Sequence, residues 1–257
     1  LSVIQQRIIP GKVIWLDKAA KDSAYRLQCV AELKGKLGIV AGGGSLTSYF
    51  APFWNALPSD QSILFVGTGI CCPHGTSEAL HPRFTLHENS RFRGPLSPPG
   101  FKSANLIPPP GILYQIERVA PTHVLSVAHP GLVDEMAQHK FARKVADRIG
   151  LPLVKITNKT SEEWAYSGAA LVIASRLHGI VMAAGNEIPC YSISRDHKID
   201  WFCNVAAIPY VNPRSKSLSE LGSADVKNAI ESRPVELDFL KDRVRSYLDL
   251  LNVPAAV

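Results

Sequence analysis

The sequence predicts an α/β fold made of two lobes with parallel sheets. Three observations support this. Short apolar segments alternate with segments of helical periodicity along the 257 residues, and this order needs crossovers between parallel strands. The apolar segments are rich in Val, Ile and Leu without strict alternation, as strands buried on both faces are. The alternation is interrupted once, by a segment at 73–111 that holds eight prolines.

The interruption predicts the domain boundaries. We expect an N-terminal lobe over residues 1–110, a C-terminal lobe over 111–235 and a helix over 236–257 that packs back on the body. The proline-rich segment 73–111 shows little periodicity. Long irregular segments inside compact proteins are usually functional loops or linkers, so we expect it to line the cleft between the lobes.

The individual elements follow from local patterns. Gly150 and Pro152 end a helix at 133–149, and Ser161 followed by two glutamates starts another. Apolar residues on one face make 237–251 an amphipathic helix. The expected strands are 13–16, 37–41, 62–67, 123–128, 151–156, 171–174 and 189–193. The expected helices are 23–34, one from about 46, 133–149, 161–170, 180–185 and 237–251.

Composition excludes several classes of protein. The net charge of +6 and pI of about 9.1 suit an anionic partner. However, the basic residues are scattered, the cluster at 140–148 has the spacing of a solvated helix face, and no nucleic-acid motif is present. No apolar run is long enough to span a bilayer, and residues 1–12 do not form a signal peptide. We therefore expect a cytoplasmic protein without nucleic-acid partners.

The five cysteines indicate reduced thiols rather than a metal site. Four of them lie in apolar segments, where buried thiols are the usual state in a reducing compartment. The run Cys71-Cys72-Pro73-His74 has no second Cys/His pair at the spacing of a zinc finger. We expect no metal ligands in this chain.

Two glycine turns follow expected strands. Gly42-Gly43-Gly44-Ser45 comes after the strand 37–41, and Gly67-Thr68-Gly69 after 62–67. Such turns let an anion approach backbone amides at a helix N-terminus, but neither matches a dinucleotide or P-loop motif. Taken alone, either turn is better explained by tight packing of strand against helix, although turns at the carboxyl ends of adjacent parallel strands lie where open sheets bind ligands.

The segment Ser175-Arg176-Leu177-His178-Gly179 is more specific. It directly follows the strand 171–174 and precedes a stretch of small residues, so Arg176 and His178 lie at the carboxyl end of a strand, where open sheets bind ligands. Arginine binds phosphate or carboxylate with two hydrogen bonds, and histidine donates or accepts a proton near neutral pH. The pair suits an anionic substrate.

Other basic residues are weaker candidates. His129 follows the strand 123–128, where a structural histidine and a ligand-binding one are equally expected. For Arg195 and His197 we expect a solvated turn with a cap at Asp196, whereas Lys198 could project back into the crevice as a point charge. Arg93 lies in the proline-rich segment, where a surface loop is the alternative to contact with an anion.

These motifs together resemble the polysaccharide pyruvyl transferase family. The resemblance rests on Ser175 to Ile180, Ile188-Pro189, Asp196 and Lys198, with support from both glycine turns, Arg93 to Ser97 and Ala128 to Pro130. They occur in the family's order from roughly residue 37 to 203. The Arg-Leu-His-Gly segment is the most specific part, and the glycine turns are weak alone.

The resemblance implies a fold, a reaction and a site. The fold is two Rossmann-like lobes similar to GT-B glycosyltransferases, with the active site in the interlobe cleft. The donor is phosphoenolpyruvate, the acceptor a sugar, oligosaccharide or lipid-linked saccharide in exopolysaccharide biosynthesis, and the product a cyclic ketal. No cofactor takes part, and contact with the inner face of the membrane stays open. The catalytic residues implied are His178, Arg176 and Arg93, and the substrate-binding residues are Gly43, Gly44, Ser45, Gly69, His129, Ser175 and Lys198.

Two alternatives stay open at this point. A GT-B-type glycosyltransferase that uses a nucleotide-sugar would share the two lobes and the basic crevice. It should have an acidic residue for the ribose, and no convincing Glu follows the strands of the C-terminal lobe. A non-catalytic binding homologue is the third hypothesis, because residues 1–23 lack the Gly-Asn-x-Gly-Asp-like loop with which the family usually opens.

Overall fold

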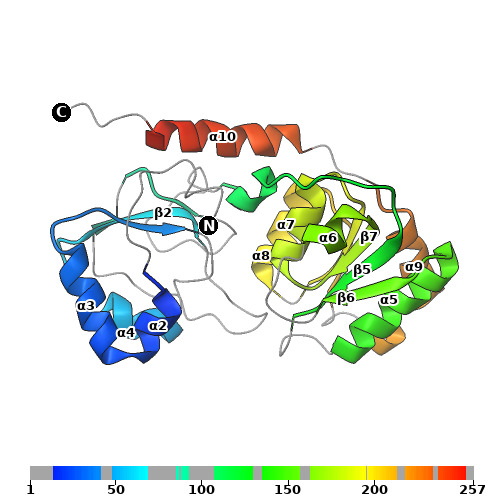
Figure 1. Cartoon of the computed structure of the whole chain (residues 1–257), viewed down its shortest axis with the longest axis horizontal. Helices are drawn as coiled ribbons and strands as arrows, with labels where there is room; N and C mark the ends of the chain where they lie inside the picture. The colour runs from blue at the N-terminus through cyan, green and yellow to red at the C-terminus, as the bar shows by residue number, and fades with distance from the viewer. Residues whose placement is uncertain are drawn as a thin grey trace. The chain divides into compact units, whose positions relative to one another are not determined.

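The fold is α/β, and every strand pair in the described part of the chain is parallel. The structure is a computed structural model (Figure 1). It describes residues 14–41, 48–68, 85–86, 88–92, 107–129, 135–156, 163–194, 196–212, 218–233 and 237–252. The chain divides into two compact units, Leu1–Pro110 together with Asp242–Val257, and Gly111–Lys241.

The first unit has a sheet in which one central strand, β2, pairs with three others. The expected strands at 37–41 and 62–67 are confirmed. Two short strands were not expected, because they lie in the segment 73–111 that lacks periodicity. The second of them is held to β2 by Phe92, which is fully buried and packs its ring 5.4 Å from that of Phe65. The strands are β1 (Gly38–Ala41), β2 (Ser62–Thr68), β3 (Thr85–Leu86) and β4 (Arg91–Phe92).

Helices pack on this sheet, and one of them corrects a prediction. The strand expected at 13–16 is wrong for the described residues, because Trp15 caps a helix that begins at Leu16. A run of four apolar residues such as 13–16 fits the start of a helix as well as a strand. The helical conformation places Ala19, one turn later, in the core, where it is fully buried. The helix at 23–34 is confirmed. The helices are α2 (Leu16–Lys21), α3 (Ser23–Leu33), η1 (Ser48–Phe50) and α4 (Ala51–Trp54).

The expected C-terminal helix is confirmed as α10 (Asp238–Asn252). Its apolar face is buried through Val244 and Leu248. The Tyr247 hydroxyl donates hydrogen bonds to the backbone oxygens of Phe65, at 3.3 Å, and Asn89, at 2.8 Å. These contacts hold the helix against β2 and explain why the chain from residue 242 onward groups with the first unit.

The second unit has a doubly wound sheet of order β6-β5-β7-β8-β9. Counted along the chain, this is the order 2-1-3-4-5, in which the direction of winding reverses between β5 and β7. The strands expected at 123–128, 151–156, 171–174 and 189–193 are confirmed. The strands are β5 (His123–Val127), β6 (Leu153–Ile156), β7 (Ala169–Ala174), β8 (Cys190–Ile193) and β9 (Tyr210–Val211).

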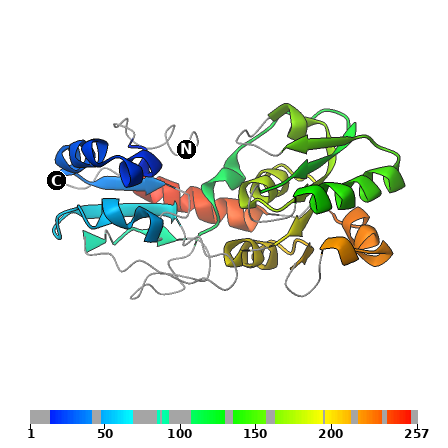
Figure 2. The same ribbon diagram turned by 90° about the horizontal axis from the view of Figure 1, so that it is seen from below.

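Helices cover both faces of this sheet. Figures 1 and 2 show α5 and α9 side by side on one face, and Figure 1 shows α6, α7 and α8 on the other. No helix in the described ranges is long and apolar enough to cross a membrane. The helices are α5 (Glu135–Ile149), α6 (Glu163–Ser167), α7 (Leu177–Gly185), α8 (His197–Val205) and α9 (Ser223–Ile230), with the short turns η3 (Pro110–Leu113) and η4 (Leu218–Glu220).

Two of these helices differ from the expectation. Helix α6 ends at Ser167 rather than 170, because Ala169 already pairs with His123 of β5. Glycine fits position 168 between them, since a Cβ there would lie 2.9 Å from the Thr122 hydroxyl. Helix α7 begins at Leu177, three residues before the expected start. The residues after β7 therefore form the first turn of a helix and not a loop.

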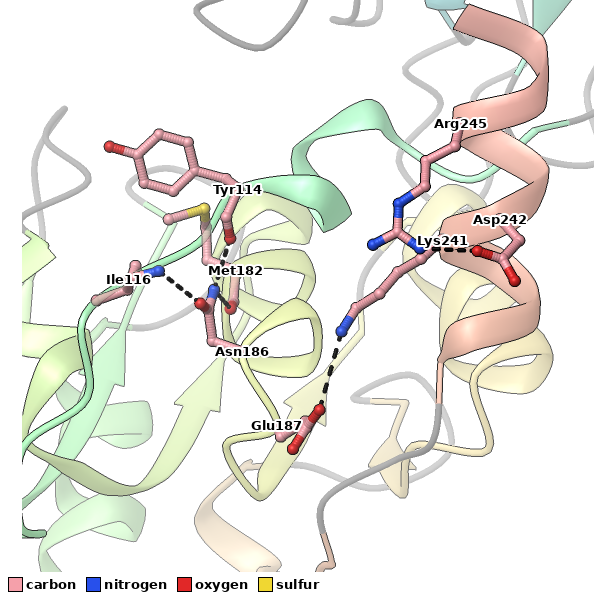
Figure 3. A network of polar contacts seen from close by, with 8 residues as sticks. All are labelled: Tyr114, Ile116, Met182, Asn186, Glu187, Lys241, Asp242 and Arg245. Carbon is pink, nitrogen blue, oxygen red and sulfur yellow. Dashed lines mark hydrogen bonds and ion pairs between the residues drawn. The ribbon is translucent and has the colours of Figure 1, made fainter. Parts of the chain in front are cut away.

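The segment that follows Pro110 is hydrogen-bonded to Asn186, at the C-terminal end of α7 (Figure 3). The Asn186 amide donates to the backbone oxygen of Tyr114 at 2.9 Å and accepts from the backbone N–H of Ile116 at 2.7 Å. A Cβ at Gly185 would lie 2.5 Å from the backbone oxygen of Ile112. Helix α7 therefore contacts this segment at one end and the carboxyl edge of the sheet at the other.

The described cysteines agree with the expected thiols. Cys29, Cys190 and Cys203 are buried and form no disulfide. Burial raises the pKa of the Cys190 thiol, and it raises that of Cys203 to about 12. Such thiols are poor nucleophiles at neutral pH, so Cys190 and Cys203 contribute to packing.

Candidate functional site

The candidate site lies where the carboxyl ends of β5 and β7 meet. Val127, the last residue of β5, pairs with Ala174, the last residue of β7. His129 follows the first strand and Ser175 the second. Because the winding reverses between these two strands, helices leave them toward opposite faces, and this is the position at which doubly wound sheets bind ligands.

Ser175 joins the two strand ends. It is 2 % exposed, and its backbone N–H donates to the oxygen of Val127 at 3.0 Å. Its hydroxyl oxygen accepts a hydrogen bond from the backbone N–H of His129 at 3.0 Å. The hydroxyl therefore holds the backbone of His129 beside the turn that leads into α7.

Arg176 is bound to the same strand end. Its Nε–H donates to the backbone oxygen of Ala128 at 2.8 Å, in a partly buried position. Burial raises the pKa of the Tyr166 hydroxyl, and the positive charge of Arg176 opposes this shift, so the guanidinium and the phenol interact. Nothing in the sequence distinguishes Tyr166 from an ordinary core residue.

The N-terminus of α7 points its first-turn amides at this edge. Arg176 occupies the N-cap position in an extended conformation and supplies no side-chain cap. First-turn amides have no partner within a helix and form its positive end, which suits an anion. His178 lies in this turn and is exposed. Gly179 allows the close approach of α7, because a Cβ there would lie 3.2 Å from side-chain atoms of Ala174 and Val127.

Lys198 lies at the next strand, after β8. The cap expected at Asp196 is confirmed, because this fully buried side chain accepts from the backbone N–H of Lys198 at 3.0 Å. The other carboxylate oxygen of Asp196 lies 2.8 Å from the Lys198 Nζ. His197 is exposed as expected, but it lies in the first turn of α8, where a solvated turn was expected. The apolar spacing of Ile199, Phe202 and Cys203 was the overlooked signal for this helix. The contact of Lys198 with substrate stays a prediction.

The remaining predicted site residues lie outside the described part of the chain. They are Arg93, Gly43, Gly44, Ser45 and Gly69. The described end of β2 is nevertheless tightly packed: Gly67 has φ +61°, and a Cβ there would lie 2.6 Å from Pro110 Cδ. Within the described ranges, no three His, Cys, Asp or Glu side chains are grouped as metal ligands.

Taken together, the described residues place four of the predicted site residues at one edge. His129, Ser175, Arg176 and His178 come from two strand ends and the start of α7. One positive side chain, one helix N-terminus and one exposed imidazole therefore adjoin each other. This arrangement can bind an anion and deliver a proton.

Two solved structures are similar to this chain at low sequence identity. The glycosyltransferase SnogD from Streptomyces nogalater is 12 % identical, with a TM-score of 0.42, and the match covers 92 % of this chain and 77 % of that one. The glycotransferase of kitacinnamycin is also 12 % identical, with a TM-score of 0.36 and coverage of 93 % and 65 %, so the chain spans just under two thirds of it.

A search of curated proteins finds no match. The model of the family described as polysaccharide pyruvyl transferase matches residues 3–197. The match begins well before the motifs at 37–203 that carry the resemblance, and it includes His129 and the whole segment from Ser175 to Gly179. Since it covers more than half of the sequence, the chain belongs to the polysaccharide pyruvyl transferase family.

Proposed function

We propose that this protein moves an enolpyruvyl group from phosphoenolpyruvate to two hydroxyls of a saccharide, with formation of a pyruvate ketal and release of phosphate. Membership of the family supports transferase activity and a saccharide acceptor. One observation carries the choice of donor: Arg176, held by its Nε–H on Ala128, lies at the N-terminus of α7, next to the exposed His178.

The donor suits such a site because it has two anionic groups. Arg176 and the first-turn amides of α7 suit either the phosphate or the carboxylate of phosphoenolpyruvate. The second anionic group needs a further cation, for which Arg93 and Lys198 are the candidates from the sequence. Asp196 already pairs with Lys198, so we assign this role to Arg93.

The reaction needs one acid and two acceptor hydroxyls. The His178 imidazolium protonates the methylene carbon of phosphoenolpyruvate, which makes C2 electrophilic. One sugar hydroxyl forms a bond to C2 and loses its proton, and the bond from C2 to the phosphate oxygen breaks. The second hydroxyl then attacks C2, loses its proton and closes the ketal. One of these protons restores the acid and the other leaves with the phosphate.

Calorimetric titration of the donor tests the proposal. Phosphoenolpyruvate should bind the wild type, and binding should weaken in Arg176→Ala but not in Arg143→Ala, an exposed arginine on α5. With a saccharide acceptor, turnover should release orthophosphate. Binding of UDP-sugar with release of UDP would instead indicate a glycosyltransferase. Binding of neither donor would indicate a non-catalytic homologue.

The scheme assigns no role to a metal or an organic cofactor, because arginine side chains and helix amides supply the positive charge. Turnover should therefore persist in EDTA, and a loss that a divalent ion restores would contradict this part. Exopolysaccharide biosynthesis, a lipid-linked acceptor and a place in the cytoplasm at the inner face of the membrane belong to the same proposal. Fractionation of cells followed by detection of the protein tests the location.

A further inference from the structure

A buried polar network lies beneath the candidate site. It consists of Ser126 on β5 together with Gln138 and His139 on α5. Ser126 and Gln138 are fully buried and His139 is 6 % exposed. Phe141, on the same helix, belongs to the apolar core that surrounds the strands here. Polar side chains in such a place need a specific explanation.

The network connects the two strands that carry the site. The Gln138 Nε2 donates to Ser126 Oγ and to the backbone oxygen of Ile173, both at 3.3 Å. Ser126 Oγ lies 2.9 Å from His139 Nδ1. Ser126 and Ile173 are direct partners in the pairing of β5 with β7. Each precedes its site segment by two residues, Ala128 in one strand and Ser175 in the other.

Stability does not explain these residues. Two of their buried atoms, Gln138 Oε1 and His139 Nε2, have no hydrogen-bond partner within the described part of the chain. Buried polar atoms without partners destabilise the folded state. Burial and the charge of Lys155 lower the pKa of His139, while Glu135 opposes the shift. Replacing all the partners of such hydrogen bonds by apolar groups of similar shape can be nearly neutral or stabilising.

We infer that Ser126, Gln138 and His139 are positioning residues for the donor site. They hold the ends of β5 and β7 in a fixed register, so that Ala128 presents its oxygen to Arg176 at the proper place. The inference rests on the proposed function in that Arg176 binds the donor. A displacement of about 1 Å at such a residue is enough to weaken binding and slow the reaction.

His123 provides a matched control on the same strand. It too is 6 % exposed, but it lies at the amino end of β5, away from the site. Both of its ring nitrogens have partners: Nδ1 lies 3.0 Å from the Thr122 hydroxyl and Nε2 lies 2.7 Å from the backbone oxygen of Ala165. Its substitution should therefore reduce stability without affecting the site.

The test is a triple variant in which the network becomes apolar, S126A/Q138L/H139F. We expect its melting temperature to equal or exceed that of the wild type, while the dissociation constant for phosphoenolpyruvate rises at least fivefold. His123→Phe should melt at a lower temperature and bind phosphoenolpyruvate within twofold of the wild type. A triple variant that is stable and binds the donor normally overturns the inference. Should the triple variant not fold, Ser126→Ala decides by the same criterion.

Amide hydrogen exchange separates this inference from the proposed function. The backbone N–H groups of His129 and Ser175 both donate hydrogen bonds between the two strand ends. Their exchange should be at least tenfold faster in the triple variant, and in Ser126→Ala, than in the wild type and His123→Phe. Unchanged exchange overturns the positioning role. Failure of the wild type to bind phosphoenolpyruvate, with exchange altered as expected, overturns only the assignment of the donor.

Discussion

Replacement of Arg176 by alanine tests the site most directly. The Nε–H of its guanidinium donates to the backbone oxygen of Ala128 at 2.8 Å, and we propose that the same group binds the donor. Charged hydrogen bonds of this kind contribute about 1.5–3 kcal/mol, which corresponds to a rise of roughly 10- to 150-fold in the dissociation constant of phosphoenolpyruvate. Isothermal titration calorimetry on the folded variant measures it.

The variant Arg176→Lys tests the same prediction more specifically. A lysine has one nitrogen, so it cannot donate to the oxygen of Ala128 and hold the donor with two further hydrogen bonds as arginine can. We expect Arg176→Lys to recover only part of the lost affinity. Arg143→Ala removes the same charge from an exposed position on α5 and controls for the change in net charge. A dissociation constant of Arg176→Ala within twofold of the wild type would refute the reasoning.

Three further outcomes are expected. His178→Ala should lower kcat by about 10²–10⁴ with donor binding nearly unchanged. The wild-type rate should fall as pH rises, because only the imidazolium delivers the proton. Lost donor binding with an unchanged pH profile would make His178 a binding residue and His129 the next candidate for the acid. Burial and Lys155 lower the pKa of His139. The folded protein should therefore lose stability as pH falls below about 6.5, the pKa of histidine in the unfolded chain, since the unfolded chain then binds more protons. Urea unfolding at pH 7.5 and 5.5 should show this decrease in the free energy of unfolding in the wild type and a smaller decrease in His139→Phe. Gly185→Ala should destabilise the protein by about 3 kcal/mol in the same assay, because its Cβ would meet a backbone oxygen at 2.5 Å; an unchanged midpoint would contradict the close packing of α7.

Much of the second unit was predictable from local pattern. The segments that became β5, β7 and β8 are predominantly apolar, and such segments are recognisable without knowledge of their partners. Segments whose residues fit more than one kind of element were not predictable in this way. Residues 13–16 were too short to distinguish strand from helix, and the start of α8 was hidden by the charged run at 195–198. The strand at Arg91–Phe92 depends on a single buried ring, which no periodicity reveals.

The candidate site was predictable only in part. Arg176 and His178 follow a strand directly, so their place at its carboxyl end is a local property. The pairing of Asp196 with Lys198 is also local, because the two residues flank the start of α8. By contrast, nothing near Ser126 in the sequence indicates that Gln138 connects it to Ile173, since that contact depends on how α5 lies across two strands.

The sequence by itself determined the α/β class, most of the buried strands and the side chains that we propose for binding an anion. These depend on hydrophobic period, on glycine and proline, and on residue type, which are all properties of short segments. The tertiary structure alone decided that β5 lies beside β7, which brings His129 next to Ser175 from 46 residues away. Strand order is set by the burial of whole faces of a sheet and by the entropy of closing long connections, and neither quantity is written in any one segment.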